Sequence, residues 1–260
     1  MISLKNKNMI VCAGSSGIGR GVVEVLSKCN ANITTFSRNI EKLNSLKKYI
    51  KEETGNDLNI IKADLSKSED IIKVVKSHHE HGDIDGLVMN YGDPRVDNFL
   101  SLDMNDWDYN INMMLKSTIL LTRFAAEDMI RKNSGRIIYI TSMTTKNPLK
   151  NFSISNTLRS GIVALGKTLS IELAPHNITV NSISQGYFCT DRLRDIINKR
   201  SEELNKSHNK VMESIKSEIP MNRFGKPEEI GNLVAFLASD LSSYITGDNI
   251  QIDGGAVKSI

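Results

Sequence analysis

The sequence has few cysteines, few aromatic residues and no long hydrophobic run. Its three cysteines, Cys12, Cys29 and Cys189, are far apart in 260 residues and form no Cys-x-x-Cys pair. This spacing argues against a disulfide framework or a zinc knuckle, and it predicts a reducing, cytoplasmic location. No segment reaches the roughly 18 to 20 apolar residues that a membrane-spanning helix needs, and the first residues lack the apolar stretch of a signal peptide. We therefore expect no membrane partner.

The chain also lacks a dominant charge of either sign. Its formal net charge is +3, from 33 basic and 30 acidic side chains that are mixed along the whole sequence. Proteins that bind nucleic acid usually concentrate basic residues in one segment or on one face, so we expect no nucleic-acid partner. The hydrophobic fraction of 40% is ordinary for a globular domain.

Short apolar runs alternate with amphipathic stretches along the chain. The apolar runs predict buried strands at 9–13, 33–36, 59–62, 86–90, 136–140, 178–184 and 250–253. The amphipathic stretches predict helices at 18–29, 41–51, 68–77, 105–131, 153–174 and 227–238. Short, wholly apolar strands separated by helices specify a parallel sheet covered on both faces. Because there is no linker or internal repeat, residues 1–260 predict a single doubly wound α/β domain, a Rossmann fold.

A glycine-rich turn lies where the first predicted strand meets the first predicted helix. Its residues are Gly14, Ser15, Ser16, Gly17, Ile18 and Gly19. Glycines let the backbone turn tightly and approach a pyrophosphate, whose charge is bound by the free N–H groups at the helix N-terminus. The turn therefore predicts a dinucleotide site, and the alternative is a glycine-rich loop without a ligand.

With its flanking residues, this turn resembles the Thr-Gly-x-x-x-Gly-x-Gly turn of the short-chain dehydrogenases/reductases, among them the 3-oxoacyl-(acyl-carrier-protein) reductases. The resemblance covers nearly the whole chain and is close at 223–255. It implies an NAD(P)-dependent oxidoreductase that acts on a small-molecule carbonyl, hydroxyl or enoyl substrate and assembles as a homotetramer or homodimer. It also implies that the charged helical insertion at 187–220 covers the substrate. Beyond the turn, it places the cofactor against Asp64, Leu65, Asn90, Gly92, Gly186 and Thr190.

Two departures from this pattern lie beside the expected cofactor. Ala13 stands where the family has a glycine, and it is strained by about 1 kcal/mol or more if its φ is positive. Tyr91 replaces a small residue, so it would stack on the cofactor or crowd it. Neither substitution removes a group that holds phosphate.

The end of the second predicted strand indicates which nicotinamide cofactor is bound. It carries Ser37 and Arg38 and no acidic residue. An acid there accepts hydrogen bonds from the ribose 2′-OH of NAD, whereas a guanidinium is shaped for the 2′-phosphate of NADP. We therefore predict NADP(H), with NAD(H) as the alternative. The other interpretation of Arg38 is a solvated surface charge.

The resemblance implies a catalytic set of Asn, Ser, Tyr and Lys, most of which this chain lacks. Ser142 falls on the serine, while Met114, Ser155 and Arg159 stand where Asn, Tyr and Lys are expected. A serine hydroxyl is a far weaker acid than the tyrosine that usually donates the proton, and arginine stays protonated. Arg159 can still hold the nicotinamide ribose and add positive potential. The usual proton relay, however, cannot operate.

Three interpretations follow from this altered site. The chain is an active reductase with another proton donor, for which Tyr187 comes first, then Thr144 or Thr145, then a water beside Ser142. Alternatively, it binds NADP(H) without turnover, as a sensor or partner subunit. In the third interpretation it is a structural relative whose cofactor site is blocked.

Two further features have ordinary and functional interpretations. His78, His79 and His81 resemble a metal cluster in composition, but no carboxylate or cysteine stands at ligand spacing, so we expect a solvated helix end and no metal site. The stretch 199–216 mixes many charges with a few apolar residues. It is either a surface helix or a lid that suits a substrate with an anionic tail, such as an acyl thioester.

Overall fold

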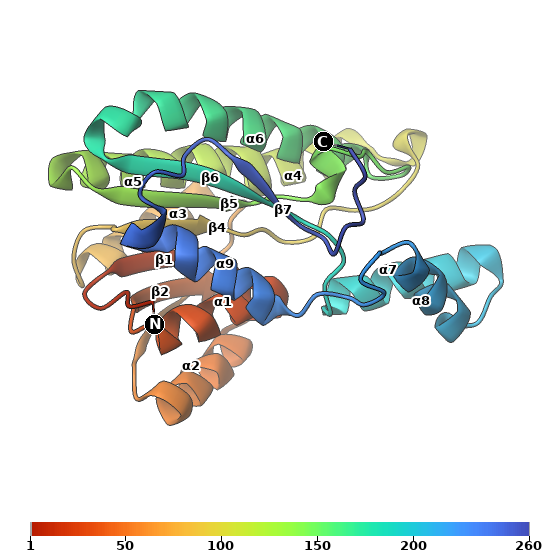
Figure 1. Cartoon of the computed structure of the whole chain (residues 1–260), viewed down its shortest axis with the longest axis horizontal. Helices are drawn as coiled ribbons and strands as arrows, with labels where there is room; N and C mark the ends of the chain where they lie inside the picture. The colour runs from red at the N-terminus through yellow and green to blue at the C-terminus, as the bar shows by residue number, and fades with distance from the viewer. Residues whose placement is uncertain (1, 260) are drawn as a thin grey trace.

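Seven parallel strands form the central sheet, in the order β3-β2-β1-β4-β5-β6-β7 (Figure 1). The computed structural model describes residues 2–259. In sequence order, the strands are β1 (Asn8–Cys12), β2 (Asn32–Ser37), β3 (Leu58–Lys62), β4 (Gly86–Met89), β5 (Gly135–Ile140), β6 (Ile178–Gln185) and β7 (Asn249–Ile252). The expected doubly wound α/β fold is confirmed, and each expected strand is present with its ends shifted by at most two residues.

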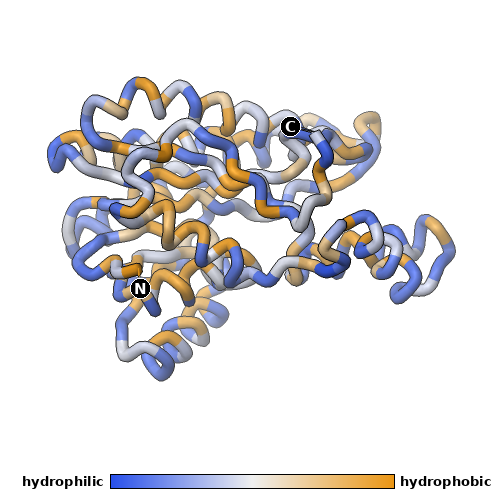
Figure 2. Tube along the Cα trace, viewed as in Figure 1, coloured by the Kyte–Doolittle hydropathy of each residue, from blue (hydrophilic) through white to orange (hydrophobic). Residues whose placement is uncertain are grey.

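Helices cover both faces of the sheet and bury its apolar side chains. One face packs against α1 (Gly17–Lys28), α2 (Ile40–Thr54) and α9 (Pro227–Ala238). The other face packs against α3 (Ser68–His79), α5 (Ser117–Lys132) and α6 (Ser153–Glu172). Figure 2 shows hydrophobic residues gathered along the central strands and alternating with hydrophilic ones along the outer helices. The chain therefore has two apolar cores, one on each side of a single sheet.

The long helix expected at 105–131 changes its winding near its middle. It consists of α4 (Met104–Asn110), a π-helical segment (Ile111–Lys116) and α5. The hydroxyl groups of Ser117 and Thr118 donate to the backbone carbonyls of Met113 and Met114, at 2.6 and 2.5 Å. Such π-turns are frequent at functional sites. The sequence predicted the helix but not the π-turn. One wider turn changes the spacing of apolar residues too little to be distinguished from that of a regular α-helix.

The insertion after β6 forms two helices that project to one side of the sheet (Figure 1). These are α7 (Asp191–Leu204) and α8 (His208–Ser217). Two cations of α7 tie it to the loop after β4: Arg192 Nη2 donates to the carbonyl of Pro94 at 2.8 Å, and Lys199 Nζ donates to that of Val96 at 2.7 Å. The pair has a small apolar cluster of its own, formed by Leu193, Ile197, Val211, Ile215, Ile219 and Phe224.

One side chain at the end of α3 is buried, so the expectation of a solvated helix end is wrong for His78. This side chain is only 1% exposed, and its Nδ1 lies 2.8 Å from Thr34 Oγ1 on β2. Its Nε2 has no hydrogen-bond partner among residues 2–259. The reason is helical spacing: Ile71, Val74 and Val75 face the sheet, and His78 continues their stripe at i+7. His81, by contrast, is exposed.

Candidate functional site

A cleft of about 470 Å³ opens at the carboxyl ends of the strands. The strand order reverses between β1 and β4, and in open α/β sheets ligands bind in the crevice at such a switch point. The cleft is bordered by the glycine-rich turn, the ends of β2, β4 and β6, and the start of α7. Most of the predicted cofactor residues line it, namely Ser15, Ser16, Gly17, Ile18, Ser37, Arg38, Asp64, Leu65, Asn90, Gly92, Arg159, Gly186 and Thr190.

The first and last glycines of the turn do not line the cleft but let the turn close. A Cβ on Gly14 would lie 2.1 Å from Thr35 Oγ1, and a Cβ on Gly19 would lie 2.2 Å from the carbonyl oxygen of Ala13. Gly17 has a φ of 52° and Ala13 a φ of 51°. Left-handed backbone costs an L-residue roughly 1–2 kcal/mol, so the strain expected for a positive φ at Ala13 is present.

Cations surround the cleft at the end of β2. Arg38 is exposed, and its Nη1 donates to the hydroxyl of Tyr109 on α4 at 3.0 Å. Lys42 lies in the first turn of α2 and also lines the cleft. Asn39 caps that helix by accepting from the backbone N–H of Lys42 at 2.7 Å. Two cations therefore line this part of the cleft, close to the start of α2, and cations are the groups that hold a phosphate.

The other end of the cleft contains a buried and under-paired guanidinium. Arg159 on α6 is 7% exposed, and its Nη1 donates to the carbonyl of Ile140 at 3.1 Å. Within the described part of the chain, its Nε has no acceptor. Burial lowers the pKa of Arg159, while the neighbouring Tyr91 and Asp93 raise it. The guanidinium therefore places a buried positive charge at this end of the cleft, with its Nε–H unpaired.

Tyr91 packs beside this guanidinium. The Arg159 guanidinium lies over its ring at 5.8 Å from the centroid, and the Tyr91 hydroxyl is hydrogen-bonded to Thr118 Oγ1 at 2.7 Å. Its side chain is 7% exposed, so it belongs to the wall of the cleft. Tyr91 therefore supports Arg159, and the cleft keeps its volume despite the larger residue.

Of the remaining predicted catalytic residues, one lines the cleft and two lie outside it. Tyr187 lines the cleft, where burial raises its pKa and Arg200 partly offsets that rise. Ser142 and Ser155 do not line it. Ser142 instead caps a short 3₁₀ turn (Met143–Thr145), accepting from the Thr144 backbone N–H at 3.2 Å. The structure thus brings Arg159 and Tyr187 together with the cofactor residues, and the catalytic roles stay predictions.

Two further positions considered for catalysis, Met114 and Thr144, are buried. Met114 is fully buried in the π-helical segment, inside the apolar core. Thr144 is buried with no partner for its hydroxyl among residues 2–259. Thr145 donates to the carbonyl of Ser142 at 2.9 Å, so its proton is already engaged. Neither threonine lines the cleft.

Sequence reasoning missed several polar residues of the cleft, four of which take part in the contacts described here. Lys42 and Tyr109 come from α2 and α4, and Asp93 and Arg192 come from the β4 loop and α7. The Arg192 Nε and an Asp93 carboxylate oxygen are 3.6 Å apart. Asp93 follows Gly92 directly, so its place next to a cofactor motif was a usable signal. The other three depend on tertiary contacts.

A second cleft of about 550 Å³ lies between α1 and the α7–α8 pair. Leu193, Ile197 and Met212 line it on the insertion side, and Arg20 and Arg194 also line it. It shares Gly17 and Thr190 with the first cleft, so the two are adjacent. The insertion thus offers both apolar and cationic groups next to the cofactor site.

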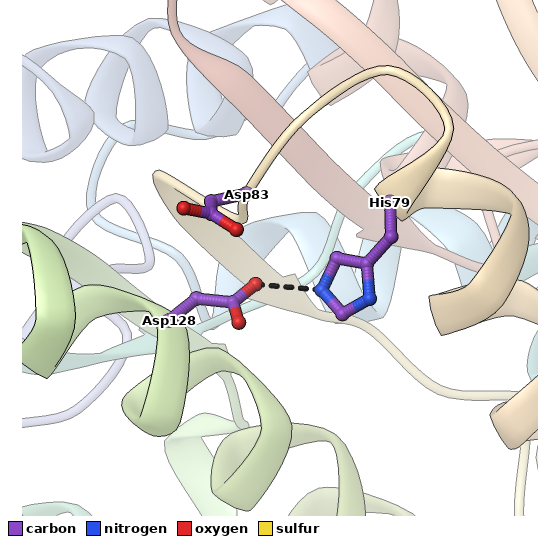
Figure 3. Close-up of side chains that lie close together, drawn as sticks. All are labelled: His79, Asp83 and Asp128. Carbon is purple, nitrogen blue, oxygen red and sulfur yellow. Dashed lines mark hydrogen bonds and ion pairs between the residues drawn. The ribbon is translucent and has the colours of Figure 1, made fainter.

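A group of potential metal ligands lies at the opposite end of the sheet. His79, Asp83 and Asp128 have ligand atoms within 4.8 Å of one another, and His79 Nε2 is 2.8 Å from an Asp128 oxygen (Figure 3). The expectation that no carboxylate accompanies the histidines is therefore wrong for His79, because distant segments supply two. Arg131 Nη2 contacts both carboxylates, at 2.6 and 3.1 Å. This cation already pairs with both carboxylates, so we interpret the group as an ion-pair cluster.

No helix among residues 2–259 is long and apolar enough to cross a membrane.

Comparison with known proteins gives full-length matches. A family model described as enoyl-(acyl carrier protein) reductase matches residues 12–257. The chain is 32% identical to the 3-oxoacyl-[acyl-carrier-protein] reductase FabG of Aquifex aeolicus over 258 residues, which are 98% of each chain. It is 30% identical to the NADPH-dependent reductase BacG of Bacillus subtilis over 259 residues, covering 99% of this chain and 100% of the relative.

Solved structures agree with these matches. YwfH, an NADPH-dependent reductase involved in bacilysin biosynthesis, is 30% identical, with a TM-score of 0.92 over 98% of this chain and 99% of that one. L-sorbose reductase from Gluconobacter frateurii, in complex with NADPH and L-sorbose, is 26% identical, with a TM-score of 0.94 over 100% of this chain and 99% of that one.

Proposed function

This chain belongs to the short-chain dehydrogenase/reductase family, and on that premise we propose that it is an NADP(H)-dependent reductase with an altered proton donor. Its substrate is a carbonyl or enoyl compound. The assignment of NADP(H) rests on the residues at the end of β2 and just after it. Ser37 stands there in place of an acid, and Arg38 and, on α2, Lys42 line the cleft. The NADPH-dependent relatives support the same assignment.

The residues of the cleft fit a nicotinamide dinucleotide. The backbone N–H groups of the glycine-rich turn would hold the pyrophosphate, and Gly17, with its positive φ, would let the backbone approach it. The Arg159 guanidinium, which lines the other end of the cleft, would hold the nicotinamide ribose. When bound, the reduced nicotinamide supplies a hydride. Arg159 then adds positive potential where negative charge develops on the substrate oxygen, an effect that is strong in a site shielded from water.

The second cleft supports a substrate with an apolar chain. Its apolar wall on α7 and α8 suits a hydrocarbon segment, whereas its cations Arg20 and Arg194 are already paired with Glu24 and Asp191 of the same cleft. An acyl thioester contains such an apolar chain. The name of the FabG relative, a 3-oxoacyl-[acyl-carrier-protein] reductase, points to the same class.

Replacing the cation at the end of β2 tests the cofactor assignment. We expect Arg38→Ala to weaken NADPH binding by about 10- to 100-fold, because a charge-assisted hydrogen bond contributes roughly 1.5–3 kcal/mol. NADH binding should change by less than about twofold, since NADH has no 2′-phosphate. Titration of each dinucleotide followed by nicotinamide fluorescence measures both constants. If Arg38→Ala weakened the binding of NADPH and NADH equally, Arg38 would not contact the 2′-phosphate, and the proposed role would be wrong.

A second function, NADP(H) binding without turnover, is favoured by Met114 and Ser155. The first is wholly buried and apolar, and the second offers only a weakly acidic hydroxyl outside the cleft. The combined change Met114→Asn, Ser155→Tyr and Arg159→Lys restores the side chains that the family resemblance implies. We expect it to raise ketone reduction by about 100-fold, because a positioned general acid contributes roughly 10²–10⁴-fold.

The two functions differ in what the unaltered chain does in the same assay. NADPH oxidation with ethyl acetoacetate or trans-2-hexenal supports the reductase. If only the triple variant turns over while both bind NADPH, the chain is a binding protein. If the chain bound neither NADPH nor NADH, both functions would be contradicted. The remaining interpretation would be a structural relative whose cofactor site is blocked.

A further inference from the structure

Asp93 is an acidic side chain in the cleft assigned to the cofactor, at the same end as Arg159. It follows Gly92 at the carboxyl end of β4, directly at the switch point between β1 and β4. It lines the same cleft as Arg159 and Tyr187. Its side chain is 55% exposed, so a molecule bound in the cleft can reach the carboxyl group.

The surroundings of Asp93 contain charges from two other elements. Arg192 on α7 lies 3.6 Å from its carboxylate, and Arg159 on α6 and Asp195 on α7 also act on it. Desolvation in the cleft raises the pKa of Asp93. Arg192 and Arg159 oppose this rise, Asp195 adds to it, and the net direction is upward. A carboxyl group with a raised pKa keeps its proton to a higher pH than an ordinary carboxyl group.

The other candidate donors are less suited to this task. Thr144 and Thr145 do not line the cleft, and Thr145 already donates to the Ser142 carbonyl. Tyr187 does line it, but its raised pKa makes it a weaker acid than an ordinary tyrosine. Asp64 and Asp191 also line the cleft, but only Asp93 is a carboxyl group of the lining that follows β4 and has Arg159 among the charges that act on it.

We infer that Asp93 is the proton donor of this altered site, facing the substrate from the β4 loop beside Arg159. The inference rests on the proposed reductase function. A hydride adds to the substrate carbon, and the carbonyl π electrons move to oxygen. The Asp93 O–H bond breaks and its proton goes to that oxygen, leaving an alcohol, the oxidised nicotinamide and a carboxylate. Water then reprotonates the carboxylate.

This assignment gives the two directions of the reaction opposite pH dependences. Reduction needs the protonated carboxyl, so kcat should fall about tenfold per pH unit once the pH exceeds the pKa of Asp93. Alcohol oxidation needs the carboxylate form of Asp93. The kcat of oxidation should therefore rise as the pH approaches the pKa of Asp93 and stay constant above it. A donor with a pKa near that of tyrosine, about 10, would leave reduction flat below pH 9.

The test compares Asp93→Asn with Asp97→Asn in the full chain. Asp97 lies on the same loop, pairs with Arg95 and does not line the cleft. With NADPH and ethyl acetoacetate or trans-2-hexenal, Asp93→Asn should lower kcat by about 10²–10⁴-fold and remove its pH dependence. NADPH affinity and thermal unfolding should stay unchanged in both variants. Asp93→Glu should recover part of the activity and keep a pH dependence.

A measurement without substrate accompanies the kinetics. A carbodiimide couples an amine to carboxyl groups, and peptide mass spectrometry identifies which residues are labelled. The extent of labelling at several pH values shows the pH range over which each carboxyl group stays protonated. Asp93 should react to a higher pH than Asp97, because the ion pair with Arg95 lowers the pKa of Asp97. Equal labelling profiles, or an active parent whose activity survives Asp93→Asn, would overturn the inference and leave the reductase function intact. A parent that binds NADPH without turnover would overturn both.

Discussion

Gly19→Ala should weaken NADPH binding by about 10- to 100-fold or more and lower the free energy of unfolding by about 1–3 kcal/mol. The added Cβ would lie 2.2 Å from the Ala13 carbonyl oxygen and 2.9 Å from Asn90 Nδ2. The nearest atom belongs to the backbone, so the turn itself has to move. Ala13 already has a strained φ of 51° and cannot absorb the displacement cheaply. Calorimetric titration with NADPH and urea unfolding measure the two effects.

Gly161→Ala is the matched control for this change. Gly161 lies within α6, and a Cβ there would meet nothing within 4 Å. Replacing a glycine inside a helix by alanine should stabilise the protein by about 0.5–1 kcal/mol and leave NADPH affinity unchanged. If both alanine variants bind NADPH as the parent does, the turn does not hold the cofactor.

Acid should destabilise this protein through His78. Burial lowers its pKa to about 4, with smaller contributions from His79 and His81 in the same direction and from Asp128 and Asp85 in the opposite one. In the unfolded chain a histidine titrates near pH 6.5, so the unfolded state binds the extra proton between the two values. The free energy of unfolding should therefore be constant above about pH 6.5. Below that it should fall by about 1.4 kcal/mol per pH unit, for a total of about 3 kcal/mol near pH 4.

His78→Asn removes this titration and keeps a polar group that can reach Thr34. The variant should be less stable at pH 7.5, because the imidazole packs against the sheet, but its stability should decline less towards pH 4. His81→Asn serves as the control, since His81 is exposed. Urea unfolding at several pH values gives the curves. Parallel curves for the parent and His78→Asn between pH 4 and 6.5 would contradict the assignment.

Part of the site was predictable because its signal is local in the sequence. The glycine-rich turn needs a strand, a turn and a helix in succession, and Gly14–Gly19 provide them within a few residues. Arg38 was recognisable because it directly follows β2. The stripe of Ile71, Val74 and Val75 would also have placed His78 inside, had its spacing been followed to i+7.

Other parts of the site depend on contacts between residues far apart in the chain. Arg38 and Tyr109 are hydrogen-bonded across 71 positions. The Asp128 carboxylate reaches His79 across 49 positions. No periodicity or motif in either segment specifies its partner, because the partner is chosen by how helices pack on the sheet.

The sequence by itself determined the doubly wound sheet and the dinucleotide turn, because apolar periodicity and glycine placement act over a few neighbouring residues. Through the family resemblance it also predicted that Met114, Ser155 and Arg159 stand at the positions of the usual proton relay, and this stays a prediction. Only the tertiary structure decided which groups meet in the cleft. There it put Arg159 and Asp93, which come from α6 and the β4 loop, and left Ser142 and Ser155 outside. The reason is that chain topology brings the carboxyl ends of distant strands to one edge, and side-chain packing selects which residues face it.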